Sequence, residues 1–294
     1  MTNVLTLIST ANSEAISDDI KDKFENKTKS TSSKWLSKHV ALDLYFEGSL
    51  DNISDDLLNE LKTENFDFAF QKISTRKKKM LIADMDSTII TVECIDELAD
   101  YLGIKEKVSK ITQAAMQGDI DFKGALRERV SLLKGLKIEE LEKVYKERIK
   151  LTPGAMTLVK TMNAHGAFTI LVSGGFTYFS EKIAKLTDFK VNRANILLHK
   201  NGKLTGEVGE PIVDADTKIN SLREFQKTLG LSDIEIIAVG DGANDIPMLV
   251  GAGLGVGYHA FPKAAAASDV VIHHGDLTAL LYLQGYSLSD FVDA

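Results

Sequence analysis

Two aspartates, Asp84 and Asp86, stand one residue apart directly after a short apolar run, residues 80–83. Residues i and i+2 of a strand point to the same side, so the two carboxylates are expected to be neighbours at the carboxyl end of a buried strand. Sheets of the α/β class place their ligands at that end. Neighbouring like charges call for a cation, and Mg²⁺ prefers hard oxygen ligands of this kind.

A second acidic cluster, residues 241–245, follows another apolar run, residues 234–239, and again ends an expected strand. The cluster reads Asp-Gly-Ala-Asn-Asp. Either cluster alone is more typical of a polar turn, because Asp, Asn and Gly are common turn residues. Two such clusters in one chain favour a shared catalytic or metal-binding site.

Two further segments carry groups that suit a phosphate. Residues 170–175 are expected to form a strand that runs into a Ser-Gly-Gly turn and then a helix, so a hydroxyl and backbone N–H groups can meet a phosphate there. Lys218, at the start of a helical segment, supplies a positive charge. Each segment alone is more often an ordinary turn or a solvated helix.

The order Asp-x-Asp-Ser-Thr, Ser-Gly-Gly, Lys and Gly-Asp-Gly-x-Asn-Asp resembles the motif set of the haloacid dehalogenase-like (HAD) phosphatases. The motifs lie between residues 80 and 275. Met85 stands where many members carry an aromatic residue, which changes packing beside the site and no chemical group. Within the family, the chain resembles the members that hydrolyse O-phospho-L-serine to L-serine and phosphate, the last step of serine biosynthesis.

The resemblance implies a nucleophile and an acid–base residue. Asp84 would attack phosphorus and form an aspartyl-phosphate, which divides hydrolysis into two easier steps. Asp86 would protonate the leaving serine oxygen and then take a proton from the attacking water. The pKa of Asp86 is therefore expected to lie above that of Asp84.

The resemblance also implies how metal and phosphate are held. Mg²⁺ would be bound by the side chain of Asp84, the main-chain carbonyl of Asp86 and Asp241, with Asp245 in its outer shell. Asn244 would help to hold the substrate. The charge of the transferring phosphoryl group would be offset by the metal together with Ser173, the N–H of Gly174 and Lys218.

Residues 93–150 are rich in helix formers, with apolar residues three and four apart, which predicts a helical cap over a small substrate. By the resemblance, Arg129 would bind the carboxylate of the substrate and Glu93 its ammonium group. Without the resemblance, either residue would be taken as surface charge. Met116 and Phe122 fit an apolar lining over the substrate methylene and plain core packing equally well.

The elements that position these residues are expected to form two units. Residues 1–74 predict a small α+β domain, ferredoxin-like or amino-acid-binding in layout, with either a regulatory or a structural role. Its strands are expected at 3–8, 34–47 and 66–73, and its helices at 12–27 and 53–63. The basic run 76–79 is interpreted as a solvated linker.

Residues 80–294 are expected to form the catalytic core, a doubly wound, mostly parallel, Rossmann-like α/β sheet with the cap inserted after its first strand. The Asn201-Gly202 pair predicts a β-hairpin that projects from this sheet. Further strands of the sheet are expected at residues 167–172, 234–239, 253–257 and 269–272.

The composition favours a cytoplasmic enzyme with a small-molecule substrate. The formal net charge of −7 disfavours nucleic acid and anionic membranes as partners. Cys94 is the only cysteine, which excludes an intrachain disulfide and indicates a reducing compartment. No apolar run approaches the length of a membrane span. A homodimer is the default expectation for the oligomeric state.

Two other interpretations stay open. A HAD phosphatase or phosphotransferase that acts on another small phosphomonoester, such as phosphohomoserine or a sugar phosphate, would share every catalytic residue and differ at Glu93 and Arg129. A non-catalytic, ligand-binding regulator would have no need to keep both Asp84 and Asp86. Dehalogenation is disfavoured, because it attacks carbon and uses neither the second aspartate nor the metal.

Overall fold

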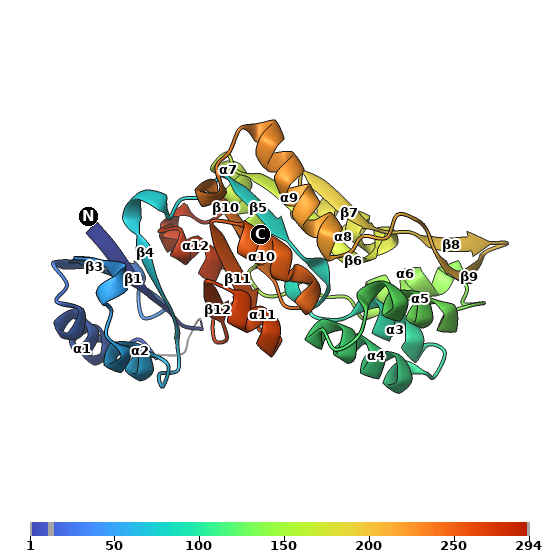
Figure 1. Ribbon diagram of the computed structural model, residues 1–294, viewed down its shortest axis with the longest axis horizontal. Coiled ribbons are helices and arrows are strands. Elements are labelled where there is room, and N and C mark those ends of the chain that lie inside the picture. The colour runs from blue at the N-terminus through green and yellow to red at the C-terminus, as the bar shows by residue number, and fades with distance from the viewer. Residues whose placement is uncertain (1, 11–14, 293–294) are drawn as a thin grey trace.

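The computed structural model of the protein describes residues 2–10 and 15–292, and its centre is a parallel sheet of six strands (Figure 1). Every pair of neighbouring strands in this sheet is parallel. Its strand order is β12-β11-β10-β5-β6-β7. The strands are β5 (Met80–Ala83), β6 (Phe168–Phe176), β7 (Val191–Asn195), β10 (Ile236–Gly240), β11 (Leu254–Tyr258) and β12 (Val270–Ile272).

This order confirms the predicted doubly wound sheet and shows where a ligand is expected. From β5 the chain proceeds outward to β6 and β7, then returns to the other side of β5 and proceeds outward through β10, β11 and β12. The direction of winding therefore changes between β5 and β10. Open α/β sheets bind their ligands at the carboxyl ends of the strands beside such a switch point.

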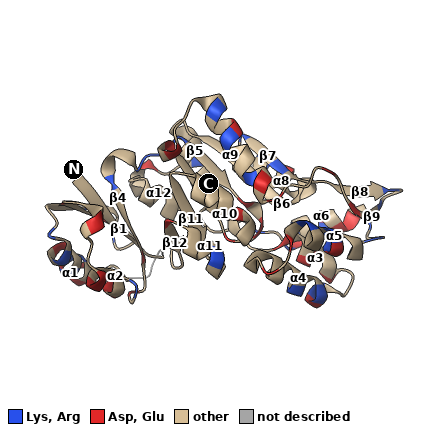
Figure 2. Ribbon diagram, in the orientation of Figure 1, with Lys and Arg blue, Asp and Glu red and all other residues tan. Residues whose placement is uncertain are grey.

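Alternate residues of the core strands pack against helices on opposite faces of the sheet. Met80 and Ile82 of β5 face the cluster formed with α9 (Ala215–Leu229), α10 (Ile246–Gly251) and α11 (Pro262–Ala267). Leu81 and Ala83 face the cluster formed with α7 (Ala155–Ala164), α8 (Thr177–Thr187) and α12 (Ala279–Leu283). Five of the six strands carry no charged residue, in contrast to the helices in Figure 2. Burial on both faces explains the continuous apolar runs in the sequence.

The predicted helical cap lies between β5 and β6. It contains α3 (Cys94–Asp100), α4 (Lys105–Gln117), α5 (Phe122–Leu132) and α6 (Ile138–Glu147). The predicted hairpin is also present, as β8 (Leu197–Lys200) and β9 (Lys203–Val208), and it runs from the sheet to the cap (Figure 1). Both Asn201 and Gly202 have positive φ, as a tight hairpin turn requires.

The hairpin is joined to the cap by backbone hydrogen bonds. The N–H of Gly135 donates to Leu204 O at 2.9 Å, and the N–H of Leu204 donates to Leu136 O at 2.8 Å. Two segments far apart in the sequence thus form one body over the carboxyl ends of the core strands.

Residues 2–72 form an antiparallel sheet of order β2-β3-β1-β4, covered on one face by two helices. Its elements are β1 (Thr2–Ile8), α1 (Asp18–Thr28), β2 (Ser32–Ser37), β3 (Ala41–Glu47), α2 (Asp55–Leu61) and β4 (Asp67–Lys72). The β-α-β-β-α-β sequence with this strand order is the ferredoxin-like arrangement. This small N-terminal domain was predicted, whereas its limits at residues 1–74 and 80–294 stay a prediction.

Two elements of this domain differ from their predicted bounds by more than two residues at one end. The strand expected at 34–47 is two strands, because the chain reverses at residues 38–40, where His39 has a φ of 60°. The helix expected at 12–27 begins at Asp18, since the hydroxyl of Ser17 accepts the N–H of Ile20 and caps it. Residues 12–14 of that prediction lie outside the described residues. Across the described chain, none of the helices combines the length and the apolar character that crossing a membrane requires.

The open face of the N-terminal sheet packs on the core, and here one expectation was wrong. The basic run 76–79 is solvated only at Lys77 and Lys79, whereas Arg76 and Lys78 are each only 5% exposed. Arg76 pairs with Asp43 and donates to the main-chain carbonyls of Tyr282 and Leu283, at the end of α12. On the edge of this interface, the carboxylate of Asp67 accepts the N–H groups of residues 273–275 that follow β12.

Candidate active site

The two acidic clusters meet at the switch point of the core sheet. Asp84 follows β5 and Asp241 follows β10, its neighbour, so both carboxylates lie at the carboxyl edge of the sheet. After Asp84 the chain forms a tight turn at Met85–Ile89, in which Ser87 has a φ of 56°. Asp84, Asp86 and Asp241 are all buried. The predicted proximity of the two clusters is therefore present in the fold.

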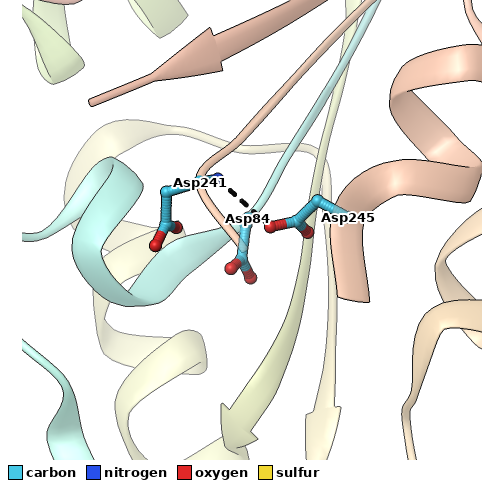
Figure 3. Close-up of side chains that lie close together, drawn as sticks. All are labelled: Asp84, Asp241 and Asp245. Atoms are coloured by element: carbon cyan, nitrogen blue, oxygen red, sulfur yellow. Dashed lines mark hydrogen bonds between the residues drawn. The ribbon is translucent and has the colours of Figure 1, made fainter. Parts of the chain in front are cut away.

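Three carboxylates form a group that could hold a metal ion. Asp84, Asp241 and Asp245 each offer an oxygen, and these oxygens lie within 4.8 Å of one another (Figure 3). Thr88 Oγ1 donates to Asp241 Oδ1 at 2.8 Å and orients that side chain. Buried hard oxygen donors suit a divalent cation that keeps some of its waters.

The three carboxylates differ in how many protein donors they already accept. Asp245 Oδ1 accepts from Lys218 Nζ at 2.6 Å, and its Oδ2 accepts the N–H groups of Asp241 and Gly242. Asp84 Oδ1 lies 2.8 Å from Lys218 Nζ as an ion pair, but it is not aligned for a hydrogen bond, and this buried oxygen accepts none. Asp84 therefore has an oxygen free to bind a metal ion, whereas both oxygens of Asp245 already accept hydrogen bonds from the protein.

Burial dominates the protonation of this group. It raises the pKa of Asp84 to about 7, with the charge of Asp245 adding to the shift and Lys218 opposing it. Burial and the neighbouring carboxylates also raise the pKa of Asp241. Lys218 is fully buried, which by itself disfavours its charge, yet the carboxylates of Asp245 and Asp84 raise its pKa above the ordinary value. A bound cation would relieve the repulsion among the carboxylates.

Asp86, beside this cluster, accepts hydrogen bonds from two groups, one of which is itself held by a third. The N–H of Cys94 donates to Asp86 Oδ1 at 3.0 Å, and Ser173 Oγ donates to Asp86 Oδ2 at 3.2 Å. The N–H of Gly175 donates to Ser173 Oγ at 2.8 Å. Burial raises the pKa of Asp86, while these hydrogen bonds oppose the shift.

The Ser-Gly-Gly segment is not the turn that was predicted. Strand β6 continues through Gly174 and Gly175 to Phe176, and α8 begins only at Thr177. Neither glycine has a φ in the left-handed region. The reason for glycine is close approach: a Cβ on Gly175 would collide with the Asp86 carboxylate, and one on Gly174 would lie 2.6 Å from the Phe122 ring. The glycines bring the backbone of β6 against the Asp86 carboxylate and the cap.

A pocket lies between these residues and the cap. It is lined from the core by Asp84, Asp86, Gly174, Gly175, Phe176 and Asn244, and from the cap and its first linker by Glu93, Ile95, Met116, Phe122, Leu126 and Arg129. The structure thus brings most predicted site residues to one cavity, while Ser173, Lys218, Asp241 and Asp245 lie beneath its floor. Met116 and Phe122 face the cavity, which favours the lining interpretation over plain core packing.

Two charged residues of the cap enter the pocket without a charged partner. Arg129 is 2% exposed, and its Nε donates to Ala125 O at 3.2 Å and its Nη1 to Thr112 Oγ1 at 3.0 Å. Among the described residues, no carboxylate forms an ion pair with it. Glu93 accepts from Ser87 Oγ at 2.8 Å, and burial together with the charge of Asp86 raises its pKa to about 8.

Sequence reasoning missed several residues that hold the site together. Ser87 and Thr88 belong to the Asp-x-Asp-Ser-Thr motif, so the motif itself is a signal for them. Asn195, at the end of β7, donates to Gly174 O at 2.8 Å and accepts the N–H of Val213 at 2.7 Å, which fixes the glycine segment. No sequence signal points to Thr112.

This fold, with its acidic switch point, buried lysine and helical cap, is that of a phosphoryl-transfer enzyme, and the chain belongs to the haloacid dehalogenase-like hydrolases. The profile that describes this family matches residues 81–250. The chain is 45% identical over 210 residues to a phosphoserine phosphatase of Polaromonas sp., an alignment that covers 70% of this chain and 89% of the relative. It is 38% identical over 289 residues to a probable phosphoserine phosphatase of Schizosaccharomyces pombe, which covers 97% and 95% of the two chains.

A solved structure extends this similarity to the fold. The core superposes on a phospho-aspartyl intermediate analogue of phosphoserine phosphatase with a TM-score of 0.67 and 41% sequence identity. The superposition covers 70% of this chain and 98% of that one. The name of that structure describes an analogue of a phospho-aspartyl intermediate, the kind of intermediate that the family resemblance implies for this chain.

Proposed function

We propose that the protein hydrolyses O-phospho-L-serine to L-serine and phosphate through an aspartyl-phosphate intermediate. The observation that carries the proposal is the buried guanidinium of Arg129, which forms no ion pair with a carboxylate of the described residues and shares one pocket with Glu93, Asp84 and Asp86. Buried charges in proteins are normally paired. A zwitterionic substrate would supply both missing charges, and the names of the relatives support the same substrate.

In this proposal Asp84 is the nucleophile. Its carboxylate attacks phosphorus, the bond to the serine oxygen breaks, and Asp86 gives its proton to that leaving oxygen. In the second step Asp86 takes a proton from the attacking water, and Asp84 is regenerated as phosphate leaves. Burial raises the pKa of Asp86, which supports its protonated form at the start of the first step.

Four groups oppose the charge of the transferring phosphoryl group. Lys218 is fixed between Asp84 and Asp245 and supplies a full positive charge. The Ser173 hydroxyl and the N–H of Gly174 lie on β6 beside Asp86. Asn244 lines the pocket and has a buried amide oxygen without a hydrogen bond, so this side chain is free to reorient toward a substrate. Donors fixed before reaction stabilise the transition state without reorganisation.

We assign Mg²⁺ as the metal, held by the side chains of Asp84 and Asp241 and the main-chain carbonyl of Asp86. Asp245 would stand in the outer shell, because both its oxygens already accept protein donors. When bound, the metal would neutralise phosphate charge and the repulsion among the carboxylates.

The cap selects the substrate in this proposal. Arg129 binds the carboxylate and Glu93 the ammonium group of phosphoserine, whereas Met116 and Phe122 cover its methylene. A pocket closed by the cap excludes water, which strengthens these charge interactions.

Phosphate release from O-phospho-L-serine, measured with and without Mg²⁺, tests the proposal. Phosphohomoserine, a sugar phosphate and an aryl phosphate serve as competing substrates, and Asp84→Asn as the inactive control. Mg²⁺-dependent preference for phosphoserine that disappears in Asp84→Asn is the expected result. Equal rates on all four phosphomonoesters would contradict the assignment of phosphoserine as the substrate. If no phosphate is released from any of them, the interpretation as a non-catalytic, ligand-binding regulator would be favoured.

The cellular setting stays part of the proposal. The reaction would complete serine biosynthesis in the cytoplasm, a location supported by the single cysteine of the chain. The homodimer stays a prediction that no contact in the structure tests.

A further inference from the structure

A chain of hydrogen bonds crosses three helices of the cap and ends on Arg129. Arg129 Nη1, on α5, donates to Thr112 Oγ1, on α4, at 3.0 Å. The Thr112 hydroxyl in turn donates to Asp96 Oδ1, on α3, at 2.7 Å. The same hydroxyl lies 3.1 Å from Val108 O, but it has one proton, and the shorter, charge-assisted bond is the one to Asp96. Thr112 therefore links the buried cation of Arg129 to the carboxylate of Asp96.

Asp96 is held in place from its other side. Ser109 Oγ donates to Asp96 Oδ2 at 2.6 Å, so each carboxylate oxygen accepts a hydroxyl proton. Asp96 is close enough to Arg129 to favour its charged form, yet it makes no ion pair with it. The hydroxyl of Thr112 lies between the two groups and is hydrogen-bonded to both.

This arrangement differs in its consequence from a direct ion pair. The guanidinium fork matches one carboxylate in a two-point contact, so a direct Asp96–Arg129 pair would compete with the carboxylate of a substrate. The Thr112 hydroxyl, which lies between Asp96 and Arg129, accepts a hydrogen bond from Nη1 but is uncharged, so it does not neutralise the guanidinium. With Nε anchored on Ala125 O, the guanidinium is fixed in position while its charge stays available to the pocket.

We propose that Thr112 is a positioning residue for carboxylate recognition, which fixes Arg129 and keeps Asp96 one hydroxyl away from it. The inference rests on the proposed function, because it requires a substrate that has a carboxylate. It predicts that Thr112 affects the choice between substrates with and without that group, and not the phosphoryl chemistry.

The test compares O-phospho-L-serine with O-phosphoethanolamine, which has the same phosphoester and ammonium group and lacks the carboxylate. In Thr112→Val the hydroxyl is replaced by a methyl group. We expect KM for phosphoserine to rise about tenfold, the loss expected for one charged hydrogen bond, with kcat little changed. The kcat/KM for phosphoethanolamine should stay at the wild-type value. Thr112→Ser, which restores the hydroxyl, should recover phosphoserine binding.

Two controls separate positioning from packing. Ser109→Ala removes the other hydroxyl on Asp96, which does not touch Arg129, and should leave the ratio between the two substrates close to wild type. Thr112→Ala provides a second hydroxyl-free variant without the added methyl group, and it replaces Thr112→Val if that protein does not fold.

The outcomes distinguish this inference from the proposed function. If the wild type shows no preference for phosphoserine over phosphoethanolamine, the proposed function fails and this inference fails with it. If the wild type has the preference and the hydroxyl-free variants retain it, the inference alone is overturned. Equal losses on both substrates would assign Thr112 to packing and would also overturn it.

Discussion

Two buried arginines in this protein stand in opposite electrostatic situations. Arg76, between the N-terminal domain and the core, is 5% exposed, and Arg129, between the cap and the core, is 2% exposed. Arg76 donates to both oxygens of Asp43, at 2.7 and 3.1 Å, and also to a threonine hydroxyl and two main-chain carbonyls. Arg129 donates to one carbonyl and one hydroxyl only.

Under the proposed function, Arg76 has a structural role and Arg129 a role in substrate recognition, and their different partners fit these roles. Arg76 has a counter-charge and a full set of acceptors, so its burial is offset within the chain, as a fixed interface requires. Arg129 is buried just as deeply, but no carboxylate of the described residues forms an ion pair with it, and it lines the pocket. A ligand that carries a carboxylate would supply the ion-pair partner that Arg129 lacks. Burial alone therefore does not identify a functional arginine, whereas burial with an incomplete set of partners does.

The largest expected effect follows from breaking the complete pair. Asp43→Ala leaves the Arg76 guanidinium without a counter-charge in a buried interface, and we expect a loss of about 3–5 kcal/mol in the free energy of unfolding. Urea denaturation measures the loss. Tyr45→Phe, which removes only the hydroxyl that donates to Asp43 Oδ2 at 3.0 Å, is the milder control. If the Asp43→Ala protein is as stable as the wild type, the Arg76–Asp43 pair does not have the structural role that we assign to it.

Removing the incomplete arginine should affect binding more than stability. Arg129→Ala is expected to lower kcat/KM for phosphoserine roughly 100-fold, which corresponds to about 3 kcal/mol. The kcat/KM for an aryl phosphate without a carboxylate should stay close to the wild-type value. Arg129→Ala should destabilise the fold less than Asp43→Ala does, because it removes a buried charge that has no ion pair, whereas Asp43→Ala creates such a charge. Arg127→Ala, an exposed neighbour on the same helix, is the matched control. Equal losses on both substrates would contradict a role in recognition.

Glu93, the other charged residue of the pocket, should make the stability of the protein depend on pH. Burial and the charge of Asp86 raise its pKa from the ordinary value near 4.5 to about 8. Between these two values the unfolded chain ionises this group before the folded one, so Glu93 lowers stability progressively as pH rises. Glu93→Gln should therefore raise the melting temperature of the metal-free protein little at pH 5 and clearly at pH 8.

Thermal unfolding in EDTA across this pH range measures the effect, with Glu128→Gln on the cap surface as control. A difference between wild type and Glu93→Gln that does not vary with pH would show that Glu93 is ionised in the folded state throughout.

The smallest effect is expected where the cap meets the core at the surface. Lys263 donates to Gly118 O at 3.1 Å and to Asp119 Oδ1 at 3.2 Å, but both charged side chains are more than half exposed. Exposed ion pairs contribute little, so Lys263→Ala should leave KM and the melting temperature near wild type. A large rise in KM would show that this contact, and not the buried pocket, governs closure of the cap.

The sequence predicted the parts of the molecule that local patterns define. The core strands appear as apolar runs, and the catalytic aspartates follow them directly, so their meeting at one sheet edge follows from the winding of an α/β fold. Strand β7 was missed because it is a half-buried edge strand with polar residues and no apolar run. The Ser-Gly-Gly segment was taken for a turn because glycine serves both turns and close backbone contacts.

Other features depend on contacts that no local pattern records. The burial of Arg76 depends on Asp43 and on carbonyls about 200 positions later in the chain. Thr112 looks like any helix residue until Arg129 and Asp96 are placed beside it. Glu93 and Arg129 themselves were indicated only by family resemblance, since charged residues on helices are usually solvated.

The carboxylate of Asp67 makes the docking of the N-terminal domain measurable. It accepts the N–H groups of His273, His274 and Gly275 at distances between 2.7 and 3.2 Å, across the boundary between the domain and the core. Those three amide hydrogens exchange with water only when the carboxylate withdraws. The rate at which they exchange with deuterated water thus reports how often the N-terminal domain separates from the core, and mass spectrometry can follow it without any change to the sequence.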